Sequence, residues 1–500
     1  MLAQLHSPEQ AVHWLRSRVG GTLQTDSRKI GAGDGFIAWP GYAVDGRRFV
    51  PAALAQGASA CLVEAAGVDA WTLDADAVAA YPGLKLATGE IAARWFGEPA
   101  RQLDMLAITG TNGKTSTAWW LAQVLSKAKQ PAQVPCAFVG TLGMGVPPGV
   151  VPTGLTTPDP VTLQRQLAEF VRQGLAACAI EASSIGIVEG RLAGTPIRLA
   201  LFTNFTQDHL DYHGSMAAYW EAKRALFSWP GLRAAVVNID DPYGAGLARE
   251  LEHTGIDLWT VACNGTAPSA RLRAAGISYD PQGLCFTVEE EGGSSAVLAT
   301  RLIGDYNVAN LLGVLAAARA LGMPLADAAA ACAELLPVPG RMECLGAPGQ
   351  PLVAVDYAHT PDALDKALAA LRPLARQRGG QLWCVFGCGG DRDAAKRPLM
   401  GAVAGKAADH VVVTSDNPRS EKPEAIISQI LLGLEQDGRV QVQADRASAI
   451  RQTLAQAAPT DVVLVAGKGH EDYQETAGLR QPFSDKQQVR EALRLRENMQ

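Results

Sequence analysis

The sequence has 500 residues, of which 48% are hydrophobic and 19% charged, and its formal net charge at pH 7 is -6. This length exceeds what one hydrophobic core supports and predicts roughly three domains, and the composition excludes a disordered chain. The negative charge argues against nucleic acid as a partner, although it is compatible with a local basic site for an anionic ligand.

The N-terminal stretch MLAQLHSPEQAVHWLRSRVGG carries charges where a signal peptide needs a continuous apolar run. No later segment offers the ~20 uncharged apolar residues of a membrane helix, so we expect a cytoplasmic protein without membrane insertion, acting as a monomer. The nine cysteines are scattered, and the closest pair, Cys384 and Cys388, has C-x-x-x-C spacing. This spacing favours buried reduced thiols over a disulfide framework or a zinc site.

The first two predicted domains cover residues 1–102 and 103–338. In the first, short apolar runs such as GFIAW and ASACLVE lie between glycine-rich turns, as in a small α/β unit. The second opens with the buried-strand pattern LDMLAIT, then a glycine loop and the helix-like STAWWLAQVLSKA, and NVANLLGVLAAARALG predicts a later long helix. We expect GVPPGVVPTG to form a loop, and LPVPGR breaks the periodicity and predicts a domain boundary.

Residues 339–500 show a regular alternation of strands and helices. Five apolar runs, LVAVD, QLWCVFG, HVVVTSD, VQVQA and VVLVAGKGHE, are each followed by a helical pattern, which predicts βαβ units and a parallel sheet. Ligands bind beyond the carboxyl ends of such strands. The polar clusters DYAHT, GCGGDRD, SDNPRS and GKGHE fall there, so we expect a binding site at that edge.

The stretch AITGTNGKTST, residues 107–117, has the character of a phosphate-binding loop, although Gly110 stands only three residues before Gly113. Between a strand and a helix, its backbone N–H groups and Lys114 can hold phosphate oxygens, and Thr115 can bind Mg²⁺. The alternative is a glycine-rich turn with a chance Gly-Lys-Thr. The strand-loop-helix context favours the nucleotide site.

Chemistry on a triphosphate needs hard oxygen ligands for magnesium. Glu181 ends the run AACAI, and Asp208 and His209 follow RLALFT, so these residues can reach the same edge of the second domain. Taken singly, Glu181 is also explained as a helix cap and His209 as a structural histidine. Together with the glycine loop they favour a site for a metal and a nucleotide.

These motifs carry a resemblance to a known family. GTNGKTS, TTPDP, EASSIG, TNFTQDHLDYHGS, GDYNVANLLG, PGRME, DYAHTPDAL and GKGHEDYQ occur in the order and spacing of the Mur ligases, ATP-dependent amide-forming enzymes of peptidoglycan synthesis. The resemblance covers nearly the whole chain. TDSRKIGAGDGFIAWPGYAVDGRRF resembles the nucleotide-sugar domain of the branch that adds the third residue of the stem peptide.

The resemblance implies an α/β fold of three domains: an N-terminal UDP-binding domain, a central P-loop domain that binds ATP, and a C-terminal Rossmann-like domain that binds the amino acid. It implies that the γ-phosphoryl group of ATP moves to a carboxylate of a UDP-linked peptide. The incoming amine then attacks the acyl phosphate. Positioning and charge neutralisation do most of the work in such transfers.

The resemblance also implies roles for individual residues. The catalytic set is Lys114, Glu181, His209 and Lys223, and the Mg²⁺ ligands are Thr115, Glu181, His209 and Lys223 as a carbamate. The ATP-binding set is Gly110, Thr111, Asn112, Gly113, Lys114, Thr115, Ser116, Asn307, Asn310, Arg341, Asp356 and His359. Without the resemblance, Lys223 would be explained as a solvated lysine on an amphipathic helix.

For the UDP-linked sugar and peptide, the resemblance implies contacts from six residues: Ser27, Arg28, Thr156, Thr157, Ser183 and Arg191. The family commonly has SSHGL followed by glutamine in this region. Here Ile185 replaces the histidine and Glu189 replaces the glutamine. A carboxylate near an acidic substrate is unexpected.

SDNPRS indicates which amino acid is added. In relatives of this branch that use meso-diaminopimelate the stretch has D-N-P-R, and the relatives that use lysine lack the arginine. The expected set is Arg392, Asp416, Asn417, Arg419, Gly467 and Glu471. The far carboxylate of diaminopimelate suits a planar guanidinium, whereas lysine would leave Arg419 unpaired. A turn entering a helix at Pro423 explains Asn417 but not the charged residues beside it.

The expected substrates are therefore ATP, UDP-MurNAc-L-Ala-D-Glu and meso-diaminopimelate. The nearest alternatives are a relative that adds another amino acid or a dipeptide, and a folylpolyglutamate synthetase; DNPR and GGDRD count against both. A P-loop switch or assembly protein is the alternative from another class. It would leave the charged strand-end loops of the last domain without a purpose.

Overall fold

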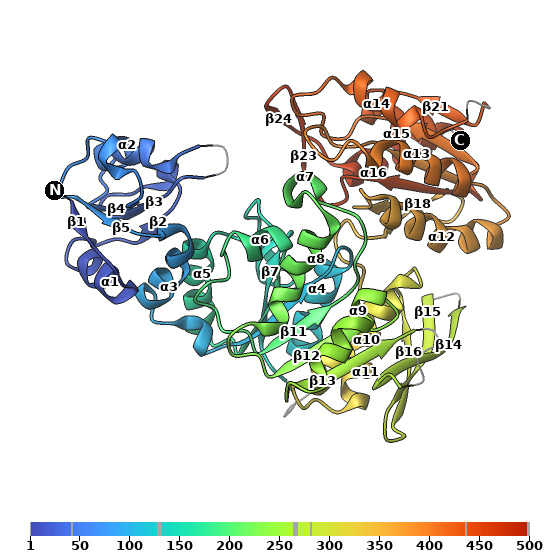
Figure 1. The fold of residues 1–500 in the computed structure, drawn as a ribbon. Coiled ribbons are helices and arrows are strands. Elements are labelled where there is room, and N and C mark those ends of the chain that lie inside the picture. The colour runs from blue at the N-terminus through green and yellow to red at the C-terminus, as the bar shows by residue number, and fades with distance from the viewer. Residues whose placement is uncertain are drawn as a thin grey trace.

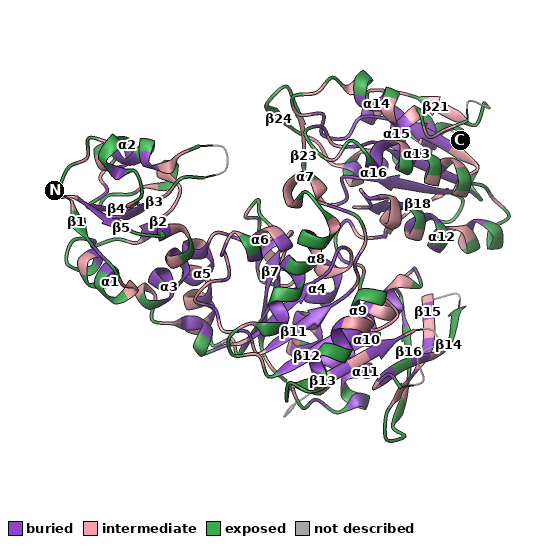
Figure 2. Cartoon of the chain, viewed as in Figure 1, coloured by how far each residue is buried: buried purple, intermediate pink, exposed green. Residues whose placement is uncertain are grey.

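The structure is a computed structural model that describes residues 2–41, 44–127, 133–263, 269–280, 283–435 and 438–497. Three lobes follow one another along the chain, each built on its own sheet (Figure 1). Figure 2 shows that the strands of the three sheets are mostly buried, whereas the outer helices expose one side. The fold is a three-domain α/β fold, as the resemblance implies. In the described ranges, every helix is too short or too polar to cross a membrane.

The N-terminal lobe has a five-stranded parallel sheet in the order β1-β5-β4-β3-β2. Helices α1 and α3 pack on one face of the sheet, and α2 packs on the other. Its elements are β1 (Ala3–Gln4), α1 (Pro8–Arg16), β2 (Leu23–Gln24), β3 (Gly35–Ala38), α2 (Val50–Ala55), β4 (Ala60–Glu64), β5 (Val78–Tyr81) and α3 (Leu84–Trp95).

The central lobe has an eleven-stranded sheet in the order β16-β15-β14-β13-β12-β11-β6-β10-β7-β8-β9. Its strands are β6 (Asp104–Thr109), β7 (Cys136–Gly140), β8 (Gly143–Val146), β9 (Gly149–Val151), β10 (Ala177–Glu181), β11 (Leu199–Phe202), β12 (Ala234–Asn238), β13 (Asp257–Ala262), β14 (Leu272–Asp280), β15 (Gly283–Glu290) and β16 (Ser295–Thr300). Its helices are α4 (Lys114–Lys127), α5 (Pro160–Arg172), α6 (Ser184–Val188), α7 (Leu210–His213), α8 (Met216–Arg224), α9 (Pro242–Leu251), α10 (Tyr306–Ala320) and α11 (Leu325–Ala333).

Strand β6 lies between β10 and β11, and all three run parallel. Helices α4, α10 and α11 cover one face of the sheet, and α5, α8 and α9 cover the other. Because both faces are covered, these strands are apolar except at their ends. The glycine loop follows β6, Glu181 is the last residue of β10, and the segment before His209 follows β11, so the topology brings all three to one edge.

The C-terminal lobe has a six-stranded sheet in the order β17-β18-β22-β19-β20-β21, parallel except for β17. The five predicted strands are present, in parallel, as expected. The elements are β17 (Glu343–Leu345), β18 (Leu352–Asp356), α12 (Pro361–Gln377), β19 (Leu382–Phe386), α13 (Lys396–Ala407), β20 (His410–Val413), α14 (Pro423–Leu431), β21 (Val440–Val442), α15 (Arg446–Gln456), β22 (Val462–Ala466), a hairpin of β23 (Tyr473–Thr476) and β24 (Leu479–Pro482), and α16 (Asp485–Glu497).

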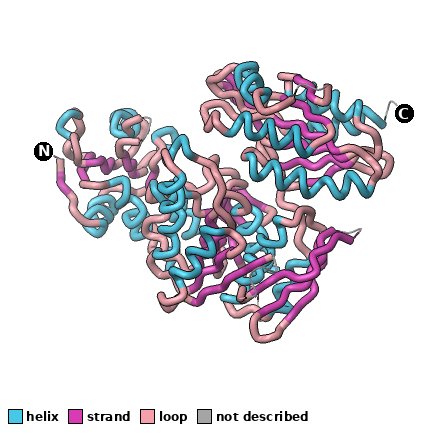
Figure 3. Tube along the Cα trace, turned by 45° about the vertical axis from the view of Figure 1, so that its right-hand side comes forward, coloured by secondary structure: helices cyan, strands magenta, loops and turns pink. Residues whose placement is uncertain are grey.

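The expected domain boundaries fall between sheets, after residue 102 and after residue 338, and we propose them as domain limits. Helix α3 of the first lobe packs against α5 of the central lobe, so these lobes share a helical contact. Figure 3 shows the third lobe apart from the first, on the other side of the central lobe. The prediction of a loop for GVPPGVVPTG is wrong in part: Gly145 and Val146 end β8, and Gly149–Val151 is a strand that pairs antiparallel with β8.

Candidate functional site

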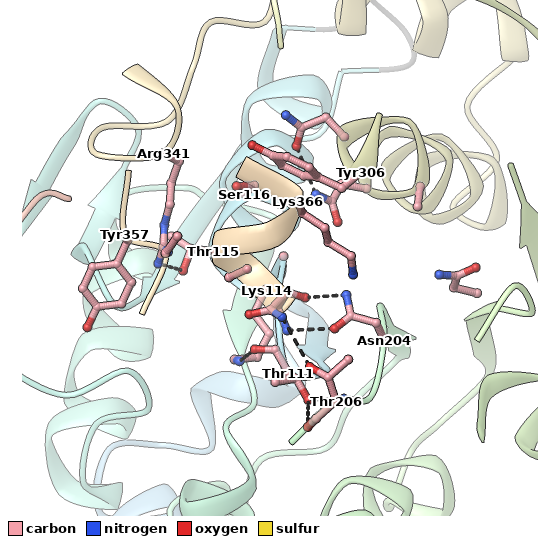
Figure 4. Close-up of a pocket in the computed structure, with 18 of the residues that line it drawn as sticks. Thr111, Lys114, Thr115, Ser116, Asn204, Thr206, Tyr306, Arg341, Tyr357 and Lys366 are labelled. Carbon is pink, nitrogen blue, oxygen red and sulfur yellow. Dashed lines mark hydrogen bonds between the residues drawn. The ribbon is translucent and has the colours of Figure 1, made fainter. Parts of the chain in front are cut away.

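A cavity of about 710 Å³ lies between the central lobe and the C-terminal lobe (Figure 4). It is lined by loops that follow β6, β10 and β11, by the start of α10, and by the segment that leads into α12. The predicted residues on its wall are Thr111, Asn112, Gly113, Lys114, Thr115, Ser116, Thr156, Glu181, Ser183, His209, Lys223, Asn307, Asn310, Arg341, Asp356 and His359. Segments that are far apart in the sequence thus line one cavity.

The glycine loop fits its surroundings only without side chains at two positions. Gly110 has φ +141, and a Cβ there would lie 1.9 Å from Thr203 Oγ1. Gly113 has φ +85, and a Cβ there would lie 2.4 Å from Asn310 Oδ1, so the loop packs directly on α10. Helix α4 begins at Lys114, which leaves the N–H groups of its first turn available to an anion.

The amine of Lys114 is held at the loop by main-chain oxygens. Its Nζ donates to Gly110 O at 3.0 Å and to Thr111 O at 2.8 Å. Burial lowers the pKa of Lys114, while the charges of Glu181 and Asp208 oppose that shift. A buried ammonium at this place has room for an anionic partner, as a phosphate-binding lysine requires.

Thr115 and Glu181 form the oxygen-rich part of the wall. Thr115 Oγ1 donates to Glu181 Oε2 at 3.0 Å, and the N–H of Thr141 donates to Glu181 Oε1 at 2.8 Å. Burial raises the pKa of Glu181, and Lys114 acts in the opposite direction. Figure 4 shows Arg341 reaching Thr115 from the C-terminal lobe, with Nη2 3.1 Å from Thr115 Oγ1.

The donor set fits a magnesium ion that is also held by phosphate. Among the described residues, no three His, Cys, Asp or Glu side chains are grouped closely enough to hold a metal by themselves. Mg²⁺ commonly takes one or two carboxylates and completes its shell with phosphates and water. Glu181 with the hydroxyl of Thr115 beside the phosphate loop provides such a partial shell.

Lys223 is buried, although a lysine on an amphipathic helix is usually solvated. The residue is 1% exposed, and its Nζ donates to Gly110 O at 2.7 Å. Burial lowers the pKa of Lys223 well below its ordinary value, the charge of Lys114 lowers it further, and Asp208 opposes both. A neutral amine is the form that reacts with carbon dioxide to give a carbamate.

His209 and His359 approach the same carboxylate from different lobes. His209 Nε2 lies 3.4 Å and His359 Nε2 4.0 Å from Asp208 Oδ2. Burial alone would raise the pKa of Asp208, but the neighbouring His209, His359 and Lys396 bring it to about 2. His209 has φ +53, which turns the chain sharply before α7. Asp208 is therefore an anion shared across the seam between the lobes.

The remaining predicted ATP residues lie on α10 and in and after the segment that joins the central lobe to the C-terminal lobe. Asn310 Nδ2 donates to Asn307 Oδ1 at 3.1 Å, and Asn307 Nδ2 donates to Ile303 O at 2.8 Å. Asp356 ends β18, and its carboxylate accepts the N–H of Met342 at 2.6 Å and that of Ala358 at 2.7 Å. Asp356 thereby holds in place the segment that carries Arg341.

The predicted residues for the UDP-linked substrate fall in two places. Thr157 Oγ1 lies 2.9 Å from Ser183 Oγ and donates to Glu181 O at 2.7 Å, and Arg191 Nη1 donates to Thr157 O at 3.0 Å. Thr156 lies on the cavity wall beside them. Ser27 and Arg28 lie in the N-terminal lobe, where the exposed Arg28 pairs with Asp26. The two places suit the two ends of an extended substrate.

Glu189 has partners that explain its charge. Its carboxylate lies 2.7 Å from Lys85 Nζ on α3 and accepts the Tyr212 hydroxyl at 2.5 Å. Burial alone would raise the pKa of Glu189, but these two contacts outweigh it and lower the pKa. The carboxylate is therefore paired across the contact between the N-terminal and central lobes, and it is not an isolated charge beside a substrate.

The predicted amino-acid residues form a separate cluster in the C-terminal lobe, and none of them lines the cavity. Asn417 Nδ2 donates to Glu471 Oε2 at 2.8 Å. A Cβ on Gly467 would lie 2.4 Å from Asp416 Oδ2. Arg419 Nη1 donates to Gly390 O at 2.7 Å, beside the loop that carries the exposed Arg392. The six residues thus meet beyond β19, β20 and β22.

Sequence reasoning missed several residues of both places. Lys468 is fully buried, with Nζ 2.9 Å from both Asn417 Oδ1 and Glu471 Oε2, and its place inside GKGHE was the signal. Figure 4 also shows Asn204, Thr206, Tyr306, Tyr357 and Lys366 around the cavity. Asn204 and Thr206 lie in TNFT, directly after a strand, where a site residue is expected.

Comparison with known proteins accounts for this arrangement. The chain matches the Mur ligase family catalytic domain over residues 22–90, the Mur ligase middle domain over residues 108–318, and the Mur ligase glutamate ligase domain over residues 340–469. It is 64% identical over 495 residues to a UDP-N-acetylmuramoyl-L-alanyl-D-glutamate–2,6-diaminopimelate ligase of Acidovorax sp. (strain JS42), covering 98% of both chains. The chain belongs to the Mur ligase family.

Solved structures of Mur ligases share this fold. One, a UDP-N-acetylmuramoyl-L-alanyl-D-glutamate–2,6-diaminopimelate ligase, is 37% identical, with a TM-score of 0.65 and 95% of each chain covered. A MurF ligase from Thermotoga maritima in complex with ADP has a TM-score of 0.65, with 97% of this chain and 99% of that chain covered. At 19% identity the second match supports the fold alone.

Proposed function

We propose that this Mur ligase is a MurE enzyme, which joins meso-diaminopimelate to UDP-MurNAc-L-Ala-D-Glu at the expense of ATP, in cytoplasmic peptidoglycan precursor synthesis. ADP and phosphate are the other products. The observation that carries the proposal is the charge pattern of the C-terminal cluster. It offers a guanidinium at Arg419 together with the buried carboxylate of Asp416 and the partly buried carboxylate of Glu471, and a doubly zwitterionic amino acid matches both signs.

ATP occupies the cavity between the central and C-terminal lobes. The loop from Gly110 to Ser116 and the first turn of α4 bind the phosphates, with the ammonium of Lys114 as a point charge. Asn307 and Asn310 lie toward the adenine, and Arg341, Asp356 and His359 contact ATP from the C-terminal lobe. The cavity volume of about 710 Å³ accommodates a nucleotide and part of a second substrate.

The residues that would hold Mg²⁺ are Thr115, Glu181 and His209, with Lys223 as a carbamate. Bound Mg²⁺ supplies charge neutralisation for the transferring phosphoryl group. The carbamate turns a cationic side chain into an anion, which adds an oxygen ligand at a place where the native amine is buried. Glu181 and Thr115 hold each other in position by their hydrogen bond.

The UDP-linked peptide spans the first two lobes. Ser27 and Arg28 hold the uridine end, and Thr156, Thr157, Ser183 and Arg191 bind the sugar and peptide. This arrangement directs the reacting carboxylate to the γ-phosphate beside Lys114. A carboxylate is a poor electrophile, and its phosphorylation creates an acyl phosphate from which phosphate leaves when the amine of diaminopimelate attacks.

Diaminopimelate binds at Arg392, Asp416, Asn417, Arg419, Gly467 and Glu471. The guanidinium of Arg419 pairs with the carboxylate at the far end of the substrate. Lysine lacks that carboxylate and would leave a charged donor without its partner. The resulting cost of a few kcal/mol corresponds to discrimination of about a hundredfold or more.

The test is phosphate release from ATP with UDP-MurNAc-L-Ala-D-Glu and one candidate amino acid at a time. Meso-diaminopimelate should support turnover at a kcat/KM about a hundredfold or more above that of lysine. D-alanyl-D-alanine and L-glutamate serve as the substrates of the alternative ligases. Equal turnover with lysine would overturn the amino-acid assignment, and phosphate release without any amino acid would favour a P-loop switch.

A further inference from the structure

Arg446, at the start of α15, has no part in the chemistry described above, yet it forms an ion pair that is wholly removed from solvent. The side chains of Arg446 and Asp485 are both 0% exposed. Arg446 Nε lies 2.7 Å from Asp485 Oδ1, and Nη2 lies 2.7 Å from Asp485 Oδ2. This bidentate pair joins the first residue of α15 to the first residue of α16.

The same guanidinium also holds two main-chain oxygens. Nη1 donates to Ser415 O at 3.1 Å, and Nη2 donates to Ala466 O at 2.9 Å. Ser415 directly precedes the loop of Asp416 to Arg419, and Ala466 directly precedes GKGHE. One buried cation therefore connects the bases of both loops that carry the proposed amino-acid site.

Arg446 also closes the base of a long excursion of the chain. Residues 467–484 leave β22 after Ala466 and return to α16 at Asp485, and Arg446 binds both ends. Within the excursion, the N–H of Phe483 donates to Asp472 O at 2.9 Å, below the β23–β24 hairpin. The position of the hairpin thus depends on the spacing between Ala466 and Asp485.

The hairpin in turn holds Arg419. The N–H of Arg419 donates to Glu475 O at 3.0 Å, and the N–H of Ala477 donates to Arg419 O at 2.6 Å. Arg419 has φ +54, a left-handed conformation that a non-glycine residue adopts only when its neighbours impose it. Glu475 also donates its N–H to Asn417 Oδ1 at 3.0 Å.

A buried ion pair is a weak source of stability, because the desolvation of two charges offsets their attraction, and apolar replacements of similar volume are often neutral. The planar guanidinium of Arg446 instead fixes the relative positions of the segments that it binds. We propose that Arg446 is a positioning residue of the amino-acid site, which sets the spacing between the 415–419 loop and the 467–484 excursion and thereby the affinity and selectivity for diaminopimelate. The inference rests on the proposed function.

The test uses the double variant Arg446→Met/Asp485→Leu in the full-length chain, which removes both buried charges together. Its thermal unfolding should stay cooperative and close to wild type, and the KM for ATP should be unchanged. The KM for diaminopimelate should rise on the order of tenfold to a hundredfold, because small displacements of binding groups have effects of this size. Selectivity over lysine should fall with it.

A matched control removes another ion pair far from this site. Arg319 on α10 pairs with Glu290 on β15 through three contacts of 2.9 to 3.1 Å, and Arg319→Met/Glu290→Leu should leave the KM for diaminopimelate unchanged. A double variant at Arg446 that folds and keeps the wild-type KM for diaminopimelate overturns the proposal. If that variant does not fold, Arg446→Lys decides by the same criterion, because lysine keeps the charge beside Asp485 but lacks the fork.

Hydrogen exchange gives a readout that needs no turnover. In the protein without substrates, amides of residues 472–484 should exchange faster in the Arg446 variant than in wild type and in the Arg319 control. Unchanged exchange would contradict the inference. Absence of diaminopimelate-dependent turnover in the wild-type protein would instead count against the proposed function, so the two failures can be told apart.

Discussion

At the scale of single residues, Lys223 shows how burial changes chemistry. A solvated lysine is protonated near neutral pH and does not form a carbamate. Lys223 is 1% exposed, and burial, with Lys114 nearby, lowers its pKa well below the ordinary value. The neutral amine of Lys223 is therefore accessible at lower pH than that of a surface lysine, which supports the proposed carbamate.

Lys223→Ala should lower kcat on the order of a hundredfold or more, because an anion beside the transferring phosphoryl group is lost. Short carboxylates such as formate or acetate should partly restore turnover by entering the space. The steady-state rate with and without added carboxylate measures both effects. Lys406→Ala, an exposed lysine on α13, is the control, and wild-type turnover in Lys223→Ala would remove Lys223 from the site.

Arg419 is a second single residue whose proposed role, the selection of diaminopimelate, depends on the geometry of its guanidinium. Arg419→Lys keeps a positive charge but loses the planar fork that matches a carboxylate. We expect the kcat/KM for diaminopimelate to fall about tenfold to a hundredfold, while ATP binding measured by calorimetry stays at the wild-type value. The exposed Arg376, changed to lysine, is the control. Unaltered selectivity between diaminopimelate and lysine in Arg419→Lys would refute its role.

The sequence predicted the site residues that lie at the ends of adjacent strands. Lys114, Thr115 and Glu181 meet because they follow adjacent parallel strands, and strand patterns are visible in the sequence. The hydrogen bond from Lys468 to Asn417 and the pairing of Glu189 with Lys85 depend on packing between distant elements. No local pattern indicates those contacts, so the sequence alone does not explain the charge of Glu189.

At the scale of elements, helix α3 attaches the N-terminal lobe to the central lobe by a close backbone contact. A Cβ on Gly89 would lie 2.2 Å from Ala193 O, and one on Gly194 would lie 2.6 Å from Gly89 O. The loop that makes this contact also carries Glu189 and Arg191. The contact therefore fixes a proposed substrate residue relative to the N-terminal lobe.

Gly89→Ala should destabilise the protein, although glycine to alanine in a helix interior ordinarily stabilises by about 1 kcal/mol. The added methyl group overlaps a carbonyl that cannot move freely, so we expect a net loss of about 1–3 kcal/mol. Thermal and urea unfolding measure it. Gly246→Ala in α9 is the control, because a Cβ there meets nothing within 4 Å and should stabilise slightly. Equal effects of the two changes would contradict the contact.

Strands that alternate regularly with helices could be predicted from the sequence. Strands that form only because a neighbouring strand pairs with them could not. The parallel strands β18 to β22 follow from apolar runs between helices. The antiparallel additions β8, β9, β15 and β16 have weaker patterns, because each strand needs its neighbour for burial. GVPPGVVPTG has the composition of a loop, yet β8 gives Gly149–Val151 a hydrogen-bonding partner and makes it a strand.

At the scale of the whole molecule, the proposed sites occupy three lobes. The cavity proposed for ATP lies between two of them, and the predicted amino-acid cluster lies outside its wall. Bridges already cross the seam: Arg341 reaches Thr115, and Asn112 Nδ2 donates to Asp362 Oδ2 at 2.8 Å. In the proposed reaction, diaminopimelate bound at the C-terminal cluster must reach the acyl phosphate in the cavity. This requires the C-terminal lobe to move toward the cavity, as in enzymes that close over bound substrates.

The most direct test follows an oxygen atom through the reaction. UDP-MurNAc-L-Ala-D-Glu labelled with ¹⁸O in the D-glutamyl carboxylates is incubated with ATP and meso-diaminopimelate, and the products are analysed by mass spectrometry. We predict that one labelled oxygen appears in each released phosphate, because the carboxylate attacks the γ-phosphorus, and that the peptide gains one diaminopimelate in an amide bond. Unlabelled phosphate, or label transfer without diaminopimelate in the product, would contradict the account.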